Sequence, residues 1–315
     1  MKAETSPQLN TRRNFLKTTT AAITATLTGS GISLALTEAQ KNNSVTAGII
    51  TDLHFGNLAP DGIQRLEVFA RAATEQKPDY IIQLGDFCHP EKAAEKLMKS
   101  WDAMPYPKHH VLGNHDMDKG TKEDIQKLWG MQKRYYDFDV NGWKFIVIDM
   151  NNLKKGDQYV PYANANFYVN SSMRSWPDPE QLKWLDQTLG KTDLPVIIYT
   201  HQPFDQPEKP QHSAILNVIK KHQTTDKHPK VKAVICGHQH QDWHRQVHGT
   251  HHICINSASY LWHAGKPWPY TDSLYTFLEI RNGKLHLSGM ETTYKQKPED
   301  IKKDPAISTR SIDLS

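Results

Sequence analysis

The chain has 315 residues, 37% hydrophobic and 23% charged, which is enough for one large domain or two ordinary ones with a sizeable core. Its net charge is only +4, and no long basic run is interleaved with aromatic residues. A charge-driven nucleic-acid-binding protein would show a stronger basic bias, so we expect no nucleic-acid-binding surface. The 3 cysteines lack framework spacing, which argues against a disulfide scaffold.

The N-terminus predicts an export signal. Residues 11–17 read Thr-Arg-Arg-Asn-Phe-Leu-Lys, a twin-arginine pattern, and residues 18–36 are uncharged but rich in Thr, Ser and Gly. Such a stretch inserts weakly into a bilayer, so we expect no permanent membrane span. We predict that residues 1–39 are a signal peptide read by the twin-arginine export machinery, and that the mature protein is periplasmic or secreted. The alternative is a disordered tail with a chance arginine pair.

Behind this segment, apolar strand-like runs alternate with helical patterns. The predicted strands are residues 45–50, 80–84, 111–112, 144–148, 196–199, 233–236, 252–256, 274–280 and 285–288. The predicted helices are residues 62–75, 91–101, 121–130, 178–189 and 212–221. Asn141-Gly142 and Asn282-Gly283 predict tight hairpin turns. The order predicts an α/β domain over residues 44–290, with two stacked mixed sheets flanked by helices. We expect the polar, lysine-rich residues 291–315 to be a loosely held tail.

Two segments look like insertions into this pattern. Residues 151–176 are long for a connection, and residues 257–270 place several aromatic residues in one loop. Each segment either lines a substrate pocket or packs on its own aromatic residues, and the sequence leaves both readings open. The candidate substrate contacts are Tyr162, Tyr260 and Trp262 from these segments, together with His89.

Five short polar segments follow predicted strands and carry the chemistry. They contain Asp52 and His54, Asp86, Asn114 with His115 and Asp116, His201, and His238 with His240. Because strands of an open α/β sheet gather ligand groups at their carboxyl ends, we expect these side chains to meet at one edge. Seven of them, all except His115 and Asp116, supply oxygen and nitrogen ligands for two metal ions with positions left open for water and phosphate. Asp86 is the best candidate to bridge the two ions.

His115 is not needed as a ligand and is therefore the candidate general acid. Its neighbour Asp116 is placed to accept the other ring N–H, which would fix the tautomer and raise the pKa of the imidazole. The alternative is that Asp116 only caps a local turn.

In these segments the chain resembles the calcineurin-like metallophosphoesterases over about residues 45–260. The resemblance implies a four-layer α/β/β/α fold and a binuclear centre. Asp52, His54, Asp86 and His240 would hold one ion, and Asp86, Asn114, His201 and His238 the other. It also implies attack of a metal-bridging hydroxide on a small phosphorylated substrate, either a phosphomonoester or a phosphodiester, with His115 as the acid.

Two departures refine this resemblance. The related purple acid phosphatases have glycine where His54 stands and tyrosine where His89 stands, so no ferric tyrosinate centre is expected. The mixed ligand set suits Mn²⁺, Fe²⁺ or Zn²⁺. Residues 135–138 and 145–150 are similar to the manganese-dependent ADP-ribose and CDP-alcohol diphosphatases, so a nucleotide diphosphatase is an alternative function. A non-catalytic scaffold of the same fold is a further alternative, but the complete ligand set argues against it.

Overall fold

The structure is a computed structural model that describes residues 44–56, 58–223 and 229–314. The predicted signal peptide, residues 1–39, lies outside these ranges. Within them, no helix combines the length and the apolar character that a bilayer crossing requires.

The first of two large sheets has the strand order β18-β15-β14-β1-β2-β3. Its parallel part is β1 (Val45–Ile50), β2 (Tyr80–Gln83) and β3 (Lys108–His110). Its antiparallel part is β14 (Thr276–Arg281), β15 (Lys284–Leu287) and β18 (Arg310–Asp313). The sheet is therefore mixed, and segments from both ends of the domain meet where β1 pairs with β14.

The second sheet has the order β10-β11-β9-β8-β5-β4. Its strands are β4 (Tyr136–Val140), β5 (Trp143–Val147), β8 (Val196–Tyr199), β9 (Val231–Cys236), β10 (Trp243–Val247) and β11 (Thr250–Cys254). The inner pairs are parallel, whereas the edge strands β4 and β10 are antiparallel to their neighbours. Both sheets thus direct the carboxyl ends of their parallel strands to one edge of the sandwich.

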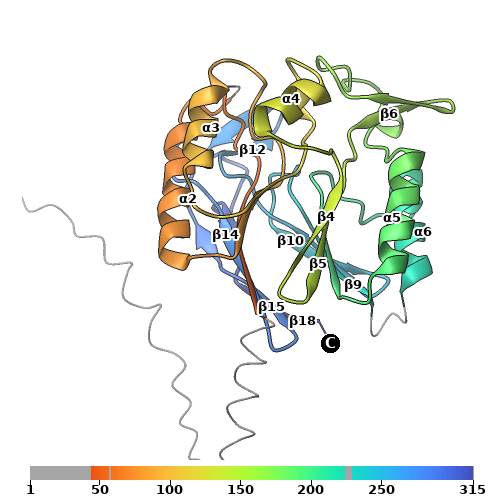
Figure 1. Ribbon diagram of the computed structural model, residues 1–315. Coiled ribbons are helices and arrows are strands. Elements are labelled where there is room, and N and C mark those ends of the chain that lie inside the picture. The colour runs from red at the N-terminus through yellow and green to blue at the C-terminus, as the bar shows by residue number, and fades with distance from the viewer. Residues whose placement is uncertain (1–43, 57, 224–228, 315) are drawn as a thin grey trace, which may run out of the picture. The chain divides into compact units, whose positions relative to one another are not determined.

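Helices cover the outer faces of both sheets (Figure 1). On the first sheet lie α2 (Gly62–Gln76), α3 (Ala94–Asp102) and α4 (Lys122–Trp129), and on the second lie α5 (Pro179–Lys191) and α6 (Pro210–His222). Thr121 and Asp124 form a capping box on α4, and Asp178 caps α5 as predicted. The prediction of two mixed sheets flanked by helices is confirmed.

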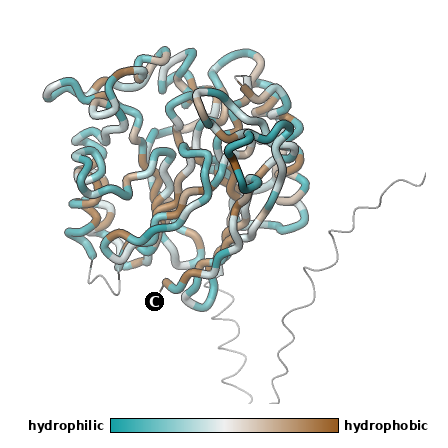
Figure 2. Tube along the Cα trace, turned by 180° about the vertical axis from the view of Figure 1, so that it is seen from behind, coloured by the Kyte–Doolittle hydropathy of each residue, from teal (hydrophilic) through white to brown (hydrophobic). Residues whose placement is uncertain are grey.

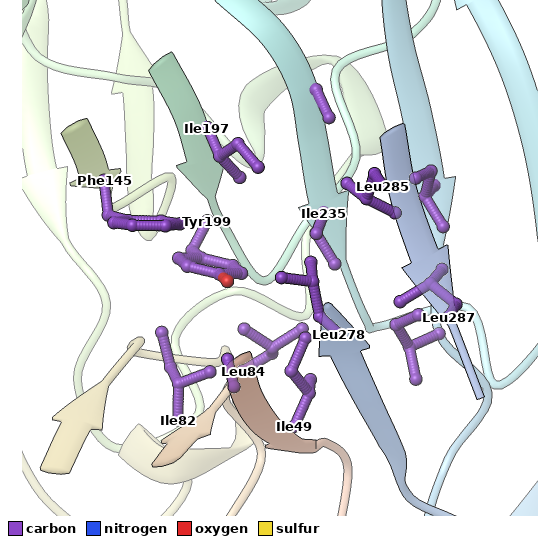
Figure 3. Packing of buried hydrophobic residues seen from close by; sticks show 14 of the residues in the cluster. Ile49, Ile82, Leu84, Phe145, Ile197, Tyr199, Ile235, Leu278, Leu285 and Leu287 are labelled. Carbon is purple, nitrogen blue, oxygen red and sulfur yellow. The ribbon is translucent and has the colours of Figure 1, made fainter. Parts of the chain in front are cut away.

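Three hydrophobic clusters hold the four layers together. The largest lies between the sheets, where residues such as Ile49, Leu278, Phe145 and Ile235 interdigitate (Figure 3). One further cluster packs the first sheet against its helices, and another packs the second sheet against its helices. Figure 2 shows brown, apolar stretches that run through the middle of the fold. This packing gives the strand ends a rigid base.

Both predicted hairpin turns are confirmed, and each turn has positive φ at its asparagine and glycine. The loosely held tail is not found. Instead β16 (Met290–Glu291) pairs with β17 (Ala306–Ile307), and β18 becomes an edge strand of the first sheet. Ile307, Ile312 and Leu314 are buried in the core between the sheets, and this burial fixes the segment. Apolar residues alternate with polar ones only at Ile312 and Leu314, which is too short a run to predict a strand.

The two segments interpreted as insertions also contain structure that the sequence reading missed. Residues 151–176 include the hairpin β6 (Asn152–Lys155) and β7 (Gln158–Pro161), followed by a short 3-10 turn at Ser171–Met173. Residues 257–270 include the hairpin β12 (Tyr260–His263) and β13 (Lys266–Pro269). We call these two segments the wall loops, because both border the site described next.

Candidate metal centre

The predicted ligand side chains come from the carboxyl ends of β1, β2, β3, β8 and β9, and the structure brings them together. Six of them form two compact groups, in each of which the ligand atoms lie within 4.8 Å of one another. One group is Asp52, His54 and His240, and the other is Asp86, His201 and His238. The grouping agrees with the two ligand sets that the family resemblance implies.

Asp86 lies between the two groups. Its Oδ2 atom is 3.1 Å from His201 Nε2 in its own group and 3.8 Å from His54 Nε2 in the other. Its second oxygen, Oδ1, accepts a 2.8 Å hydrogen bond from the backbone N–H of His115. One carboxylate oxygen therefore faces both candidate ion positions while the other fixes the side chain.

The ring nitrogens are oriented as metal ligands. His201 Nδ1 lies 2.8 Å from the carbonyl oxygen of Leu84, and His240 Nδ1 lies 2.7 Å from that of Tyr260. Each carbonyl can only accept, so each Nδ1 carries the proton and each Nε2 turns its lone pair to the centre. This second contact of the ring is the usual companion of a metal-bound histidine.

Two observations test whether cations fit here. His54 Nε2 and His240 Nε2 are 3.1 Å apart, and His201 Nε2 and His238 Nδ1 are 3.3 Å apart. His201 and His240 each direct a lone pair inward, which a cation between the rings would satisfy. In addition, Asn114 Oδ1 is buried with no hydrogen-bond partner among the described residues. A buried amide oxygen without a donor is costly, and a cation would compensate it. The residues present therefore fit two cations.

The backbone at the centre is strained in a way that aims these side chains. Five ligand residues have φ between 50° and 70°, a region that residues other than glycine seldom adopt: Asp52, His54, Asp86, His238 and His240. Such conformations persist where the surroundings enforce them, and they concentrate at functional sites. Here each one turns the chain sharply as it leaves a strand.

Two glycines allow the strand ends to approach so closely. Gly85 has φ +95°, and a Cβ atom there would lie 2.6 Å from Gly113 N and from His201 Nδ1. At Gly237 a Cβ would lie 2.1 Å from Thr51 Oγ1 and 2.5 Å from Asp52 Oδ2. Any larger residue would push the two ligand groups apart.

The electrostatics favour ionised carboxylates and neutral imidazoles. Burial opposes ionisation of Asp52, but His240 and His201 outweigh it and lower the pKa of Asp52 to about 2. Burial lowers the pKa of His54 and of His238 to about 3. His201 differs, because Asp86 and Asp52 overcome the effect of burial and raise its pKa to about 10. A cation would replace that proton as the partner of both carboxylates.

His115 lies at the edge of the centre, and its partner is Asp118. His115 Nδ1 is 2.8 Å from Asp118 Oδ2, so the ring is oriented with Nε2 free to face a substrate. Burial opposes protonation of His115, but Asp86 and the hydrogen bond to Asp118 outweigh it and raise its pKa. This combination suits a general acid.

The prediction that Asp116 orients His115 is wrong. Both carboxylate oxygens of Asp116 accept backbone N–H groups instead, from Asp86, Phe87, Cys88 and Gly113. The buried carboxylate therefore clamps the loops after β2 and β3 together, which is closer to the alternative reading of a local cap. The short 3-10 turn His115–Met117 places the residue three positions after His115, rather than the next one, beside the ring. That i, i+3 spacing was the signal that could have identified Asp118.

The four candidate substrate contacts have different positions. His89 is buried behind Asp118, with Nε2 3.8 Å from its Oδ2, and lines neither cavity at the centre. Tyr162 is buried, and its hydroxyl accepts the N–H of Ser175. Tyr260 is buried with its ring centroid 4.6 Å from that of His240. Trp262 is exposed at the entrance.

Two cavities open at the centre, one on each side of His238 and Gln239. The larger, of about 820 Å³, is bordered by His54, His115, Tyr260 and Trp262, and we call it the aromatic cavity. The smaller, of about 430 Å³, is bordered by Asn114, Tyr162 and polar residues of the loops 171–175 and 202–211, and we call it the polar cavity. The sequence reading missed Tyr168 and Leu58, which also border the aromatic cavity.

Comparisons with known proteins agree with this geometry. The family model of the calcineurin-like phosphoesterases matches residues 45–242. A 3′,5′-cyclic-nucleotide phosphodiesterase from a Nostoc species is 27% identical over 231 residues, 67% of this chain and 77% of that protein. A manganese-dependent ADP-ribose/CDP-alcohol diphosphatase from Arabidopsis thaliana is 21% identical over 252 residues, 67% of this chain and 79% of that protein.

A solved structure shows the same fold. A dimetal phosphatase from Danio rerio superposes with a TM-score of 0.62 at 16% identity, covering 86% of this chain and 99% of that one. At this identity the likeness concerns the fold alone. Because the family model covers well over half of the sequence and its ligand segments converge as described, the chain belongs to the calcineurin-like phosphoesterase family.

Proposed function

We propose that this metal-dependent phosphoric ester hydrolase works with two divalent cations, one in each ligand group, and with His115 as its general acid. The observation that carries the proposal is the pair of adjacent ligand groups with the unpartnered Asn114 Oδ1 beside them. Two cations held there would lower the pKa of a water molecule and offset the charge that develops on a phosphate. Mn²⁺, Fe²⁺ and Zn²⁺ all suit the mixed carboxylate, imidazole and amide set.

The residues around the cations have separate roles in this proposal. His115 gives its Nε2 proton to the leaving oxygen, and Asp118 holds the ring and stabilises its protonated form. Asp86 ties the two functions together, since its Oδ1 accepts the backbone N–H of His115 while Oδ2 faces both ligand groups. Asp116 supports the loop geometry without touching the substrate.

The substrates that fit this family are small phosphomonoesters and phosphodiesters. A nucleotide diphosphatase is the second candidate, and the similarity to the Arabidopsis diphosphatase favours it. The similarity to cyclic-nucleotide phosphodiesterases favours a diester. All of these substrates place one phosphorus at the two ligand groups.

Export by the twin-arginine route is a further part of the proposal, and it rests on the pattern of residues 11–17 and the uncharged stretch 18–36. Replacing Arg12 and Arg13 by lysine should keep the full-length precursor in the cytoplasm. Processed protein outside the cytoplasm in that variant would contradict the route.

The function is tested with protein lacking residues 1–39, loaded in turn with Mn²⁺, Fe²⁺ or Zn²⁺. Aryl phosphomonoesters, aryl phosphodiesters and nucleotide diphosphates are the substrates. We expect turnover with at least one metal and none after chelation. Failure to retain any metal, together with no turnover of any substrate, would overturn the enzymatic function.

A further inference from the structure

The exposed apolar side chains of this protein are concentrated at the aromatic cavity. Within the described residues, the large hydrophobic side chains that remain exposed are Tyr168 (64%), Trp262 (53%), Leu58 (37%) and Val169 (37%). Tyr168, Trp262 and Leu58 border the aromatic cavity, and Val169 is the chain neighbour of Tyr168. Exposed apolar groups that gather at one place mark a binding surface rather than ordinary surface scatter.

The same cavity contains the candidate general acid. His115 borders it, and the His115 ring centroid lies 6.3 Å from that of Tyr168. A general acid must be within hydrogen-bond reach of the oxygen that it protonates. The leaving group therefore has to occupy the aromatic cavity, where Tyr168 and Trp262 offer flat faces to an aromatic ring.

The polar cavity on the other side has a different character. Arg174 and Lys209 border it, and neither forms an ion pair within the described part of the chain. Glu208 also borders it, so the cavity is polar rather than simply cationic.

A buried orphan atom in the polar cavity points to a ligand. Gln202 is only 2% exposed, and its Nε2 donates to Asn151 Oδ1 at 2.5 Å. Its Oε1 has no hydrogen-bond partner among the described residues. A buried acceptor of this kind requires a donor such as a hydroxyl group, because a buried oxygen without a hydrogen bond costs free energy.

We propose that the substrate is a phosphodiester or diphosphate with two organic arms, whose leaving arm carries an aromatic base and whose retained arm carries hydroxyl groups. The leaving arm stacks between Tyr168 and Trp262 in the aromatic cavity. The retained arm lies in the polar cavity, where one hydroxyl donates to Gln202 Oε1. This inference rests on the proposed function and specifies its substrate class.

The reaction balances as a hydrolysis. A water molecule releases one proton to solvent and its oxygen bonds to phosphorus. The bond between phosphorus and the oxygen of the base-bearing arm breaks, and that oxygen takes the Nε2 proton of His115. His115 then regains a proton from solvent. The products are the base-bearing alcohol, or its phosphate when the substrate is a diphosphate, and the phosphorylated retained arm.

The direction of cleavage tests this assignment with the methyl ester of thymidine 5′-phosphate. Its two leaving groups are both simple primary alcohols, so the protein rather than intrinsic reactivity decides which one departs. We expect thymidine and methyl phosphate as products, identified by chromatography. Release of methanol and thymidine 5′-phosphate would overturn the assignment.

Variants supply the second readout. Stacking of a base on an aromatic side chain contributes about 1–3 kcal/mol, so Trp262→Ala and Tyr168→Ala should each lower kcat/KM on this diester by about 5- to 150-fold. The matched controls are Trp268→Ala on the same hairpin as Trp262 and Tyr159→Ala in the same wall loop as Tyr168, because neither residue borders a cavity at the centre. Both variants should keep kcat/KM within about threefold of wild type. Losses of equal size in the controls would overturn the stacking role.

The polar arm is tested by exchanging methyl for glyceryl. If a glyceryl hydroxyl donates to Gln202 Oε1, kcat/KM should be about 2- to 10-fold higher for the glyceryl diester than for the methyl diester. Gln202→Leu should abolish that gain. Because Gln202→Leu also removes the bond to Asn151, Arg174→Ala serves as a second variant that should diminish the gain, with the exposed Arg281→Ala as its control. Calorimetric titration with glycerol 3-phosphate should show the same loss of affinity in both polar-cavity variants. No gain in the wild-type protein would overturn this half of the proposal.

The failures are distinguishable. If the wild-type protein hydrolyses no phosphate ester with any metal, the proposed function itself fails. If it hydrolyses monoesters but not the thymidine diesters, only the two-arm substrate is overturned.

Discussion

The strand ends and the wall loops of this molecule meet at one site but are built in opposite ways. The ligands at the strand ends are largely buried, their backbone is strained, and glycines let the loops touch. The wall loops instead leave Trp262 exposed on the β12–β13 hairpin and Tyr168 exposed in the irregular segment after β7, both outside the two large sheets. In the proposed function, the rigid sandwich therefore holds the groups that react, whereas the wall loops contact the substrate.

The wall loops are nevertheless anchored. The buried Arg65 on α2 donates to the carbonyl oxygens of Ala258 and Tyr270, near the two ends of the second wall loop. It also pairs with Asp61 one turn earlier on the chain. The anchoring lies at the base of the loop, so the entrance residues remain free to contact a substrate.

The largest expected effect concerns the strand ends. Asp86→Asn keeps the shape of the side chain but removes the charge between the two ligand groups. We expect kcat/KM to fall by about three orders of magnitude or more, because the electrostatic contribution of the cations is several kcal/mol. Metal content by mass spectrometry should fall with activity. The exposed Asp157→Asn is the control, and wild-type activity in Asp86→Asn would contradict a bridging role.

His115→Ala separates the acid from the metal ligands. We expect a loss of about 10²- to 10⁴-fold on substrates with alkyl leaving groups and a much smaller loss on 4-nitrophenyl esters, which hardly need a proton. Metal content should remain unchanged, and the exposed His244→Ala should behave like wild type. Equal losses on both kinds of substrate would show that His115 is not the acid.

Arg65→Ala tests the anchor of the wall loop. Its removal takes the guanidinium donor away from two carbonyl groups, of which that of Ala258 still accepts the N–H of Leu274 at 3.4 Å. We expect the free energy of unfolding to fall by about 2–4 kcal/mol. Denaturant unfolding measures this, with the exposed Arg71→Ala on the same helix as the control. If Arg65 positions the second wall loop without affecting the metal centre, the KM of the variant should rise while its metal content stays constant. A fall in metal content would mean that the two regions are not separable.

Asp118→Asn gives the smallest effect and a pH signature. We expect a loss of about 10- to 100-fold, as for other residues that orient a reacting group. Asp118 helps to raise the pKa of His115 against burial, and the acid form is lost as the pH rises through that pKa. Asp118→Asn should therefore move the falling alkaline limb of the pH–rate profile to lower pH. An unchanged alkaline limb would contradict the conclusion that the contact with Asp118 raises the pKa of His115.

The sequence predicted that the candidate ligand side chains meet, because each one follows an apolar strand, and parallel strands bring their carboxyl ends together regardless of loop detail. The failures lie where side-chain direction depends on local turns. Asp116 is adjacent to His115 in the chain, yet the 3-10 turn points it at backbone amides and brings Asp118 to the ring instead. In the same way, the strand β18 was hidden, because only its burial against the other sheet, and not a local pattern, fixes it.

The sequence identified the two wall-loop segments but did not show which of their aromatic residues are exposed at a cavity. Tyr162 and Trp262 both come from segments with several aromatic residues, but Tyr162 is buried with its hydroxyl hydrogen-bonded, whereas Trp262 is exposed and borders the aromatic cavity. No periodicity separates the two cases, since both lie in irregular or hairpin structure. Tyr168, which borders the aromatic cavity, carries no sequence signal of its own.

Anomalous X-ray diffraction from crystals loaded with Mn²⁺ would show directly whether two cations sit side by side at the strand ends. We expect two peaks, one among Asp52, His54 and His240 and one among Asp86, Asn114, His201 and His238, roughly 3.5–4 Å apart. A single peak, or peaks away from these residues, would contradict the two-cation centre.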